Sequence, residues 1–245
     1  ERMDPICRLL WWERNRPEVM TKARYFLGWG EYLSLKLTGR AVIDRSCAGR
    51  YLVYDFGTHR WSPERLSQFG IKLELLPEVE PWGKPIGTLQ THVAKRLGLG
   101  RDLKVGVGAN DVVCCALGSG VSEAGTGCLI SGSWEDILLP VEHPPEASKL
   151  TAMGVSIGPF PGKARMAVYA LNPTGNAAMN WVRGLVNFNL RETDRTFKTT
   201  GLGPGSVLAI PHVSGAAVPW AGGSKLRGAF MGLTLAARGT DIVKA

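Results

Sequence analysis

The stretch KVGVGANDVVCCALG, residues 104–118, carries the clearest structural pattern of the sequence. Val105 and Val107 predict a short strand, residues 108–111 a tight turn, and the apolar run to Leu117 a helix. A polar turn between a strand and a helix is typical of α/β proteins, whose sites lie where strands end. The predicted fold class is therefore α/β, and Asp111 is the first candidate for a functional side chain.

The sequence before this stretch predicts mainly helices. Residues 86–89 and 91–97 predict a strand and a helix, and residues 76–85, rich in proline, an irregular connection. Asp4, Ser62 and Gly39 are placed to cap helices, as is Asp44. The expected helices are residues 5–12, 17–27, 32–38, 45–54 and one opening at 63.

Beyond the glycine-rich residues 118–120 the pattern changes to strands. We expect a helix over residues 176–185. The expected strands are residues 128–130, 137–139, 167–171 and 207–210. The best domain boundary is therefore near residue 119.

Composition excludes several classes of protein. The 245 residues are 44% hydrophobic and 20% charged, as in globular proteins, and no apolar run is long enough to cross a bilayer. Charged residues interrupt the start, so it does not resemble a signal peptide. The net charge of +8 comes from scattered basic residues and not from a nucleic-acid-binding arm. Five cysteines without a CxxC pair indicate a reducing, cytoplasmic compartment and no metal cluster.

Four stretches, in this order, resemble the FGGY family of carbohydrate kinases. The first is MDPICRLLWWERN, residues 3–15, with Arg8 in place of the usual lysine. The others are YLSLKLTG at residues 32–39 with the segments through residue 89, GVGAND at 106–111, and GAFMGL at 228–233 followed by Asp241 and Ile242.

This resemblance implies a fold and an activity. The fold is two ribonuclease-H-like domains of the actin/hexokinase type with a cleft between them, both incomplete in this chain. Residues 1–119 resemble the later part of the N-terminal domain, and residues 120–245 the earlier part of the C-terminal domain. The implied activity is ATP-dependent phosphorylation of a hydroxyl of a small sugar or polyol, with a pentulose or polyol favoured.

The resemblance makes Asp111 the general base that takes the proton of the attacking hydroxyl, with Asn110 beside it as a substrate-binding residue. Independently of family, an aspartate before an apolar helix is expected to be its N-cap, where the helix dipole favours the ionised form. Phosphoryl transfer needs mainly positioning and charge neutralisation, so one base suffices.

The expected nucleotide-binding residues lie in two segments. The first is SGSW, residues 131–134, whose Gly132 and Ser133 take the place of the family's glycine-hydroxyl loop, with Trp134 as a departure. The second is PTGN, residues 173–176, which opens a helix whose positive end can bind phosphate. Gly175, Asn176 and Asn180 are the candidates there, and a simple cap is an equal alternative for this segment. Residues 125–127 are interpreted as an ordinary turn before a strand.

The motif Asp-x-Gly-Thr in YDFGT, residues 54–58, cradles phosphate in this superfamily when it lies in a hairpin. Here the next residues lead to the helix start at Ser62, so no second strand is expected, and we interpret the motif as structural. Trp11, Trp12, Trp29 and Tyr32 have helical spacings and are predicted to be core residues.

The family's own phosphate hairpin, its adenosine segment and the aspartate that organises Mg²⁺ have no counterpart in this chain. The cofactors expected for the parent protein are ATP and Mg²⁺, with no metal ligand in this chain, and the chain alone is expected to be inactive. Expected partners are a sugar or polyol and ATP, without nucleic acid or membrane, and a homodimer is one open assembly state. The alternatives are a non-catalytic sugar-binding or regulatory relative with a degraded nucleotide site and, with less support, an actin-like assembly protein.

Overall fold

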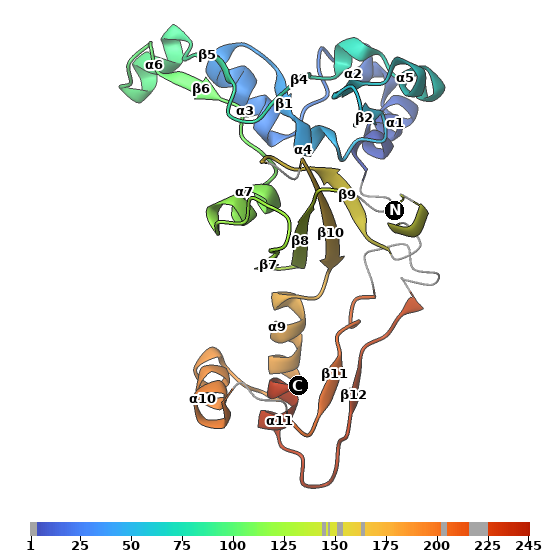
Figure 1. Cartoon of the computed structure of the whole chain (residues 1–245), viewed down its shortest axis with the longest axis vertical. Helices are drawn as coiled ribbons and strands as arrows, with labels where there is room; N and C mark the ends of the chain where they lie inside the picture. Colours follow the sequence, from blue (N-terminus) through green and yellow to red (C-terminus); the bar gives the residue numbers. More distant parts are fainter. Residues whose placement is uncertain are drawn as a thin grey trace. The chain divides into compact units, whose positions relative to one another are not determined.

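A computed structural model describes residues 4–143, 146, 148–150, 154–162, 165–201, 205–215 and 225–245. The chain divides into two compact units, Glu1–Glu123 with Gly158–Ala167, and Ala124–Ile157 with Val168–Ala245. Each unit combines helices with short strands (Figure 1), which confirms the predicted α/β class. None of the helices in the described part of the chain has the length and apolar character that a membrane span requires.

The first unit contains helices between short strands. Its helices are α1 (Pro5–Asn15), α2 (Pro17–Met20), α3 (Trp29–Thr38), α4 (Arg45–Ala48), α5 (Pro63–Phe69), the 3₁₀ turn η1 (Leu73–Leu75), α6 (Thr91–Leu97) and α7 (Asp111–Gly118). Its strands are β1 (Val42–Asp44), β2 (Tyr54–Asp55), β3 (Arg60–Trp61), β4 (Glu78–Glu80), β5 (Pro85–Thr88) and β6 (Lys104–Gly106).

Local capping explains where several helices begin and end. The Asp4 carboxylate accepts a hydrogen bond from the Ile6 N–H at 2.8 Å, and Ser62 caps α5 through the Arg65 N–H. Gly39 ends α3 in the left-handed conformation, at φ 84°, which only glycine adopts readily. These three helix ends are where the sequence predicts them.

Two predicted helices are too long, and one strand pair was missed. Helix α2 ends at Met20 and not at residue 27, and α4 ends at Ala48 and not at residue 54. Strands β1 and β4 pair in parallel, Val42 opposite Glu78, where the sequence predicts an irregular connection. Each strand is only three residues long, so its sequence alone has no periodicity to detect.

The YDFGT segment does form a hairpin, contrary to the prediction. Strands β2 and β3 pair antiparallel, with Asp55 opposite Arg60, before α5 begins. The Asp55 carboxylate accepts from the N–H groups of Thr58 at 3.0 Å and Gly57 at 2.7 Å, and these bonds hold its pKa below the usual value. The N–H groups of Gly57 and Thr58 are therefore already bonded to the Asp55 carboxylate and are not free to hold a phosphate. We keep the prediction that this motif has a structural role and does not bind phosphate.

The core of the first unit lies among α1, β1, α4, α5 and the β2–β3 hairpin. Its buried residues are Ile6, Leu9, Ile43, Ala48, Tyr51, Val53, Tyr54, Trp61, Leu66, Ile71 and Leu76. A smaller cluster joins Val42, Ile86 and Val107.

The prediction that Trp11, Trp12, Trp29 and Tyr32 are core residues is wrong. They are 53%, 38%, 90% and 47% exposed, respectively. The buried face of α1 carries Ile6 and Leu9, so the two neighbouring tryptophans fall outside that face and contact each other edge to face.

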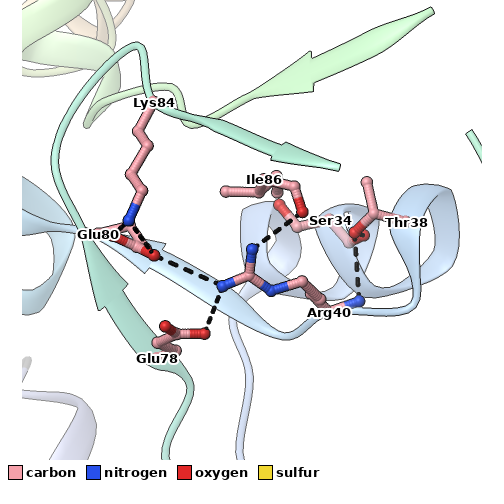
Figure 2. Close-up of polar contacts among 7 residues, drawn as sticks. All are labelled: Ser34, Thr38, Arg40, Glu78, Glu80, Lys84 and Ile86. Atoms are coloured by element: carbon pink, nitrogen blue, oxygen red, sulfur yellow. Dashed lines mark hydrogen bonds and ion pairs between the residues drawn. The ribbon is translucent and has the colours of Figure 1, made fainter. Parts of the chain in front are cut away.

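A charged network holds β1, β4 and β5 together (Figure 2). The Arg40 guanidinium donates to Glu78 at 2.6 Å and to the Ile86 carbonyl at 3.1 Å. Lys84 Nζ lies 2.7 and 2.6 Å from the two oxygens of Glu80, whose side chain is 8% exposed. The hydrogen bonds from Lys84 and the charge of Arg40 lower the pKa of Glu80, so this buried acid is matched by cations.

The second unit is built on longer strands. Strands β7 (Cys128–Ser131), β8 (Glu135–Val141) and β10 (Met166–Asn172) form, with β9 (Ser156–Pro159), one sheet in the order β7-β8-β10-β9 (Figure 1). Strands β11 (Leu208–Ile210) and β12 (Ala229–Met231) pair antiparallel. The helices are α9 (Asn176–Leu185), α10 (Leu190–Thr200) and α11 (Gly239–Lys244), and α9 has the bounds that the sequence predicts.

Candidate functional site

Asp111 lies at the start of α7, where β6 and its following turn end. Asn110 and not Asp111 is the N-cap, since the Asn110 amide oxygen accepts from the Val112 N–H at 3.2 Å. The predicted cap is therefore wrong by one residue. As the first residue of the helix, Asp111 is exposed and lies at the positive end of the helix dipole.

A buried pair of side chains anchors the turn that carries Asp111. The Asn110 N–H donates to the Ser46 hydroxyl oxygen at 2.8 Å, and that hydroxyl in turn donates to the Asp44 carboxylate. Asp44 also accepts the N–H groups of Ser46 at 2.7 Å and Cys47 at 3.1 Å. Asp44 and Ser46 are each 6% exposed, so this chain of bonds is shielded from water.

The sequence predicts only part of this anchor. Asp44 is recognisable as a helix cap, but its connection to Asn110 through Ser46 spans 64 residues. No local pattern signals such a contact.

Asp111 and Asn110 line the same hollow, about 550 Å³ in volume, within the first unit. The hollow therefore brings together the predicted base and the predicted substrate-binding residue. Its other walls come from the start of α3, from β1 and α4, and from the turn after β6: Gly28, Trp29, Gly30, Glu31, Ser34, Val42, Ile43, Asp44, Cys47, Arg50, Tyr51, Val107, Gly108 and Ala109, with Pro5 of α1.

Glu31 is a buried carboxylate in the wall of the hollow. It is 7% exposed and accepts the Gly28 N–H at 2.6 Å, which fixes the first turn of α3. Burial raises the pKa of Glu31, and the negative charge of Asp44 raises it further, against the opposing hydrogen bond from Gly28. Sequence reasoning missed Glu31, because a glutamate at the third position of a helix is a common capping residue.

Cys47 is a packing residue of the same wall. Burial and the neighbouring Asp44 carboxylate raise the pKa of its thiol, so the thiol is neutral at physiological pH.

In the second unit, the predicted phosphate turn packs directly on the start of α9. Gly132 lies between β7 and β8, and its carbonyl accepts the Asn176 N–H at 2.9 Å. A Cβ atom on Gly175 would lie 2.6 Å from the Gly132 oxygen, so only glycine fits at this approach. The structure therefore brings together Gly132, Gly175 and Asn176.

Two of the N–H groups that are predicted to donate hydrogen bonds to phosphate are bonded within the chain. The Gly132 N–H donates to the Trp134 carbonyl at 2.8 Å, and the Asn176 N–H is used as described above. Ser133 is exposed in the turn, and the Asn176 residue is exposed at the start of α9. Asn180 lies one turn further along α9, where its amide oxygen accepts from Arg183.

A pocket of about 360 Å³ opens beside this turn within the second unit. Its polar lining comprises Ser131, Glu135, Thr174 and Asn176, with Gly175 beside them. Gly132, Ser133 and Asn180 are not among its lining residues. The rest is mostly apolar and comes from α9, β11, β12 and α11; among these residues are Met179, Val182, Ile210, Pro211, Phe230 and Val243. Sequence reasoning missed this apolar part, since it comes from four separate elements.

The described residues do not offer a metal site. Among them, no group of three or more His, Cys, Asp or Glu side chains could hold a metal ion. The structure thus supplies no cluster of protein ligands into which Mg²⁺ would fit, and no residue is assigned to it.

Residues 1–118 match the N-terminal domain of the "FGGY family of carbohydrate kinases". Among curated relatives, xylulose kinase of Lactococcus lactis is 27% identical over 94% of this chain and 45% of its own length. L-Fuculokinase of Salmonella typhi is 28% identical over 74% of this chain and 38% of its own length. The chain thus spans less than half the length of these relatives.

Solved structures agree with the sequence relatives. Ligand-bound xylulose kinase from Lactobacillus acidophilus superposes with a TM-score of 0.83 and 26% identity, over 99% of this chain and 49% of that one. Glycerol kinase from Plasmodium falciparum, at 18% identity, shares the fold with a TM-score of 0.80, over 97% of this chain and 48% of that one. The predicted actin/hexokinase-type fold of FGGY sugar kinases is therefore confirmed, and the domain boundary at residues 119/120 stays a prediction.

Proposed function

Because residues 1–118 match the N-terminal domain of the FGGY family of carbohydrate kinases, we propose that this protein transfers the terminal phosphoryl group of ATP to a hydroxyl of a small sugar or polyol. The relatives named above are a xylulose kinase and an L-fuculokinase, which supports a ketose of five or six carbons as the acceptor. The observation that carries the proposal is the exposed Asp111 carboxylate in the lining of the hollow.

Asp111 acts as the general base in this proposal. An alcohol is a weak nucleophile, and a carboxylate within hydrogen-bond reach takes its proton as the new bond to phosphorus forms. The buried Asp44–Ser46 anchor limits the positions that Asp111 can take, which is the kind of support that precise proton transfer requires. Asn110 presents an amide to a neighbouring hydroxyl of the sugar.

The pocket of the second unit is the proposed nucleotide site. Its apolar part suits a purine base, and the start of α9 in its lining offers a positive dipole end for phosphate. Ser133, exposed in the adjoining turn outside the lining, is the proposed hydroxyl donor. ATP with Mg²⁺ is the proposed phosphoryl donor. Mg²⁺ would neutralise phosphate charge there, and no step is assigned to a protein-bound metal.

The test is Asp111→Asn in the intact protein. Asparagine keeps the shape of the side chain but cannot take a proton, so we expect phosphoryl transfer to fall by at least about a hundredfold. The unfolding midpoint and sugar binding, measured by calorimetry, should stay near the wild-type values.

Asp102→Asn is the matched control, because Asp102 is an exposed aspartate of the same unit outside the lining of the hollow. It should leave turnover unchanged. Turnover retained in the Asp111 variant would refute the role of the base.

A non-catalytic sugar-binding relative is the second candidate. It is favoured by one observation: the N–H groups of Gly132 and Asn176, which are predicted to hold phosphate, bond within the chain. Calorimetric titration with ATP separates the two candidates, because a kinase binds ATP and a pure sugar sensor does not.

A further inference from the structure

Trp29 is an exposed tryptophan in the wall of the hollow that contains Asp111. It is 90% exposed, although tryptophan is highly buried on average. Trp29 contributes almost no buried area to the described part of the chain, and it belongs to the lining of the hollow together with Asn110 and Asp111.

The backbone around Trp29 is anchored while its side chain stays open. Trp29 is the first residue of α3, and the Gly28 N–H before it is bound by the Glu31 carboxylate at 2.6 Å. Glu31 is itself buried, so the turn is fixed from within.

Both neighbours of Trp29 are glycines. A Cβ atom on Gly28 would lie 2.5 Å from the Glu31 carboxylate, which explains that glycine. A Cβ atom on Gly30 would meet nothing within 4 Å, so the space beside Trp29 is open. Two neighbours without side chains leave the indole ring accessible.

The remaining walls supply the polar half of a sugar site. Asn110 and Asp111 offer an amide and a carboxylate, which bond to hydroxyl groups. A sugar also has a face of C–H groups, and an aromatic ring covers such a face while the polar groups fix its orientation.

We infer that Trp29 is the stacking wall for the sugar whose hydroxyl faces Asp111, and that it favours sugars of five or six carbons over three-carbon polyols. The choice of a sugar as ligand rests on the proposed function. A longer carbon chain presents a C–H face wide enough to cover the indole ring, whereas glycerol covers only part of it.

The experiment compares Trp29→Ala with Trp11→Ala in the intact protein. Trp11 is also an exposed tryptophan of the first unit, 53% exposed, and it does not line the hollow. Binding of xylulose, L-fuculose and glycerol is measured by calorimetry without nucleotide, and thermal unfolding of each variant is recorded.

We expect Trp29→Ala to weaken binding of xylulose or L-fuculose, whichever the wild type binds, by about fivefold or more, with glycerol affected less than about twofold. Trp29→Phe should restore most of the affinity, and Trp11→Ala should bind like the wild type. Unchanged binding in Trp29→Ala, an equal loss for glycerol, or no binding of any of the three by the wild type would overturn the inference.

Phosphoryl transfer is measured separately on the same proteins. A wild type that binds sugar through Trp29 but transfers no phosphate would refute the proposed kinase activity and leave the stacking role in place. If the protein transfers phosphate but its sugar affinity is the same with and without Trp29, the proposed kinase activity stands and the stacking role of Trp29 is refuted.

Discussion

The turn that carries Asp111 and the turn that carries Ser133 are held in different ways. In the first unit, side chains do the anchoring: Asp44 and Ser46 bind the backbone before Asp111. In the second unit, backbone groups anchor the turn, because the Gly132 carbonyl accepts the N–H of Asn176 at the start of α9. This close approach is possible because Gly175 has no side chain. A side-chain anchor can be removed by deleting one oxygen, whereas a backbone anchor is broken only by adding an atom.

The largest effect is therefore expected from Gly175→Ala. The new Cβ would lie 2.6 Å from the Gly132 oxygen and 3.0 Å from the Trp134 backbone, and neither can move without displacing the turn. We expect the free energy of unfolding to fall by about 1–3 kcal/mol and ATP binding to be lost, with sugar binding retained. Urea unfolding and calorimetry on the intact protein measure the two.

Gly184→Ala is the control on the same helix. A Cβ atom there would meet nothing within 4 Å, and alanine is favoured over glycine in a helix by about 0.5–1 kcal/mol. This variant should be as stable as the wild type or more so. If the two alanine variants had the same free energy of unfolding, the close approach at Gly175 would not contribute to stability.

Ser46→Ala tests the other anchor and should have an intermediate effect. It removes the oxygen that accepts from the Asn110 N–H and leaves that partly buried donor without this partner, at a cost of about 1–2 kcal/mol. Because Asp111 follows directly, we expect kcat to fall by about tenfold with the KM for ATP unchanged.

The matched substitution is Ser119→Ala at the other end of α7, where an exposed hydroxyl donates to the Cys115 carbonyl at 2.9 Å. It should change neither kcat nor stability by a measurable amount. If Ser46→Ala changed stability alone, with kcat intact, the anchor would be structural and Asp111 would not depend on it.

The same contrast explains what the sequence could predict. Helices α6 and α9 have their predicted bounds, because caps and periodicity are local signals. The β1–β4 pair and the bond from Asn110 to Ser46 connect residues 36 and 64 positions apart, respectively, and neither partner has a pattern of its own. Trp29 was predicted to be buried because spacing identifies a helix face but does not say what covers it.

The smallest effect is a pH dependence that distinguishes two buried carboxylates of the first unit, Glu31 beside the Asp44 anchor and Glu80 in the charged network. Burial and the charge of Asp44 raise the pKa of Glu31 above its usual 4.5, so the folded protein holds this proton more tightly than the unfolded chain. The contribution of Glu31 to stability is thus complete below pH 4.5 and is lost as the pH rises through the pKa of the folded state. The difference in unfolding free energy between the wild type and Glu31→Gln should therefore fall with rising pH.

Glu80→Gln should show the opposite slope. Lys84 and Arg40 lower the pKa of Glu80, so its contribution is present above pH 4.5 and is lost as the pH falls through the lowered value. Urea unfolding from pH 3 to pH 7 measures both variants against the wild type. Parallel slopes would mean that the charge of Glu31 is as well compensated as that of Glu80. Opposite slopes would show that the buried charge of Glu31, unlike that of Glu80, is not compensated by a neighbouring cation, as is common for acids in binding sites.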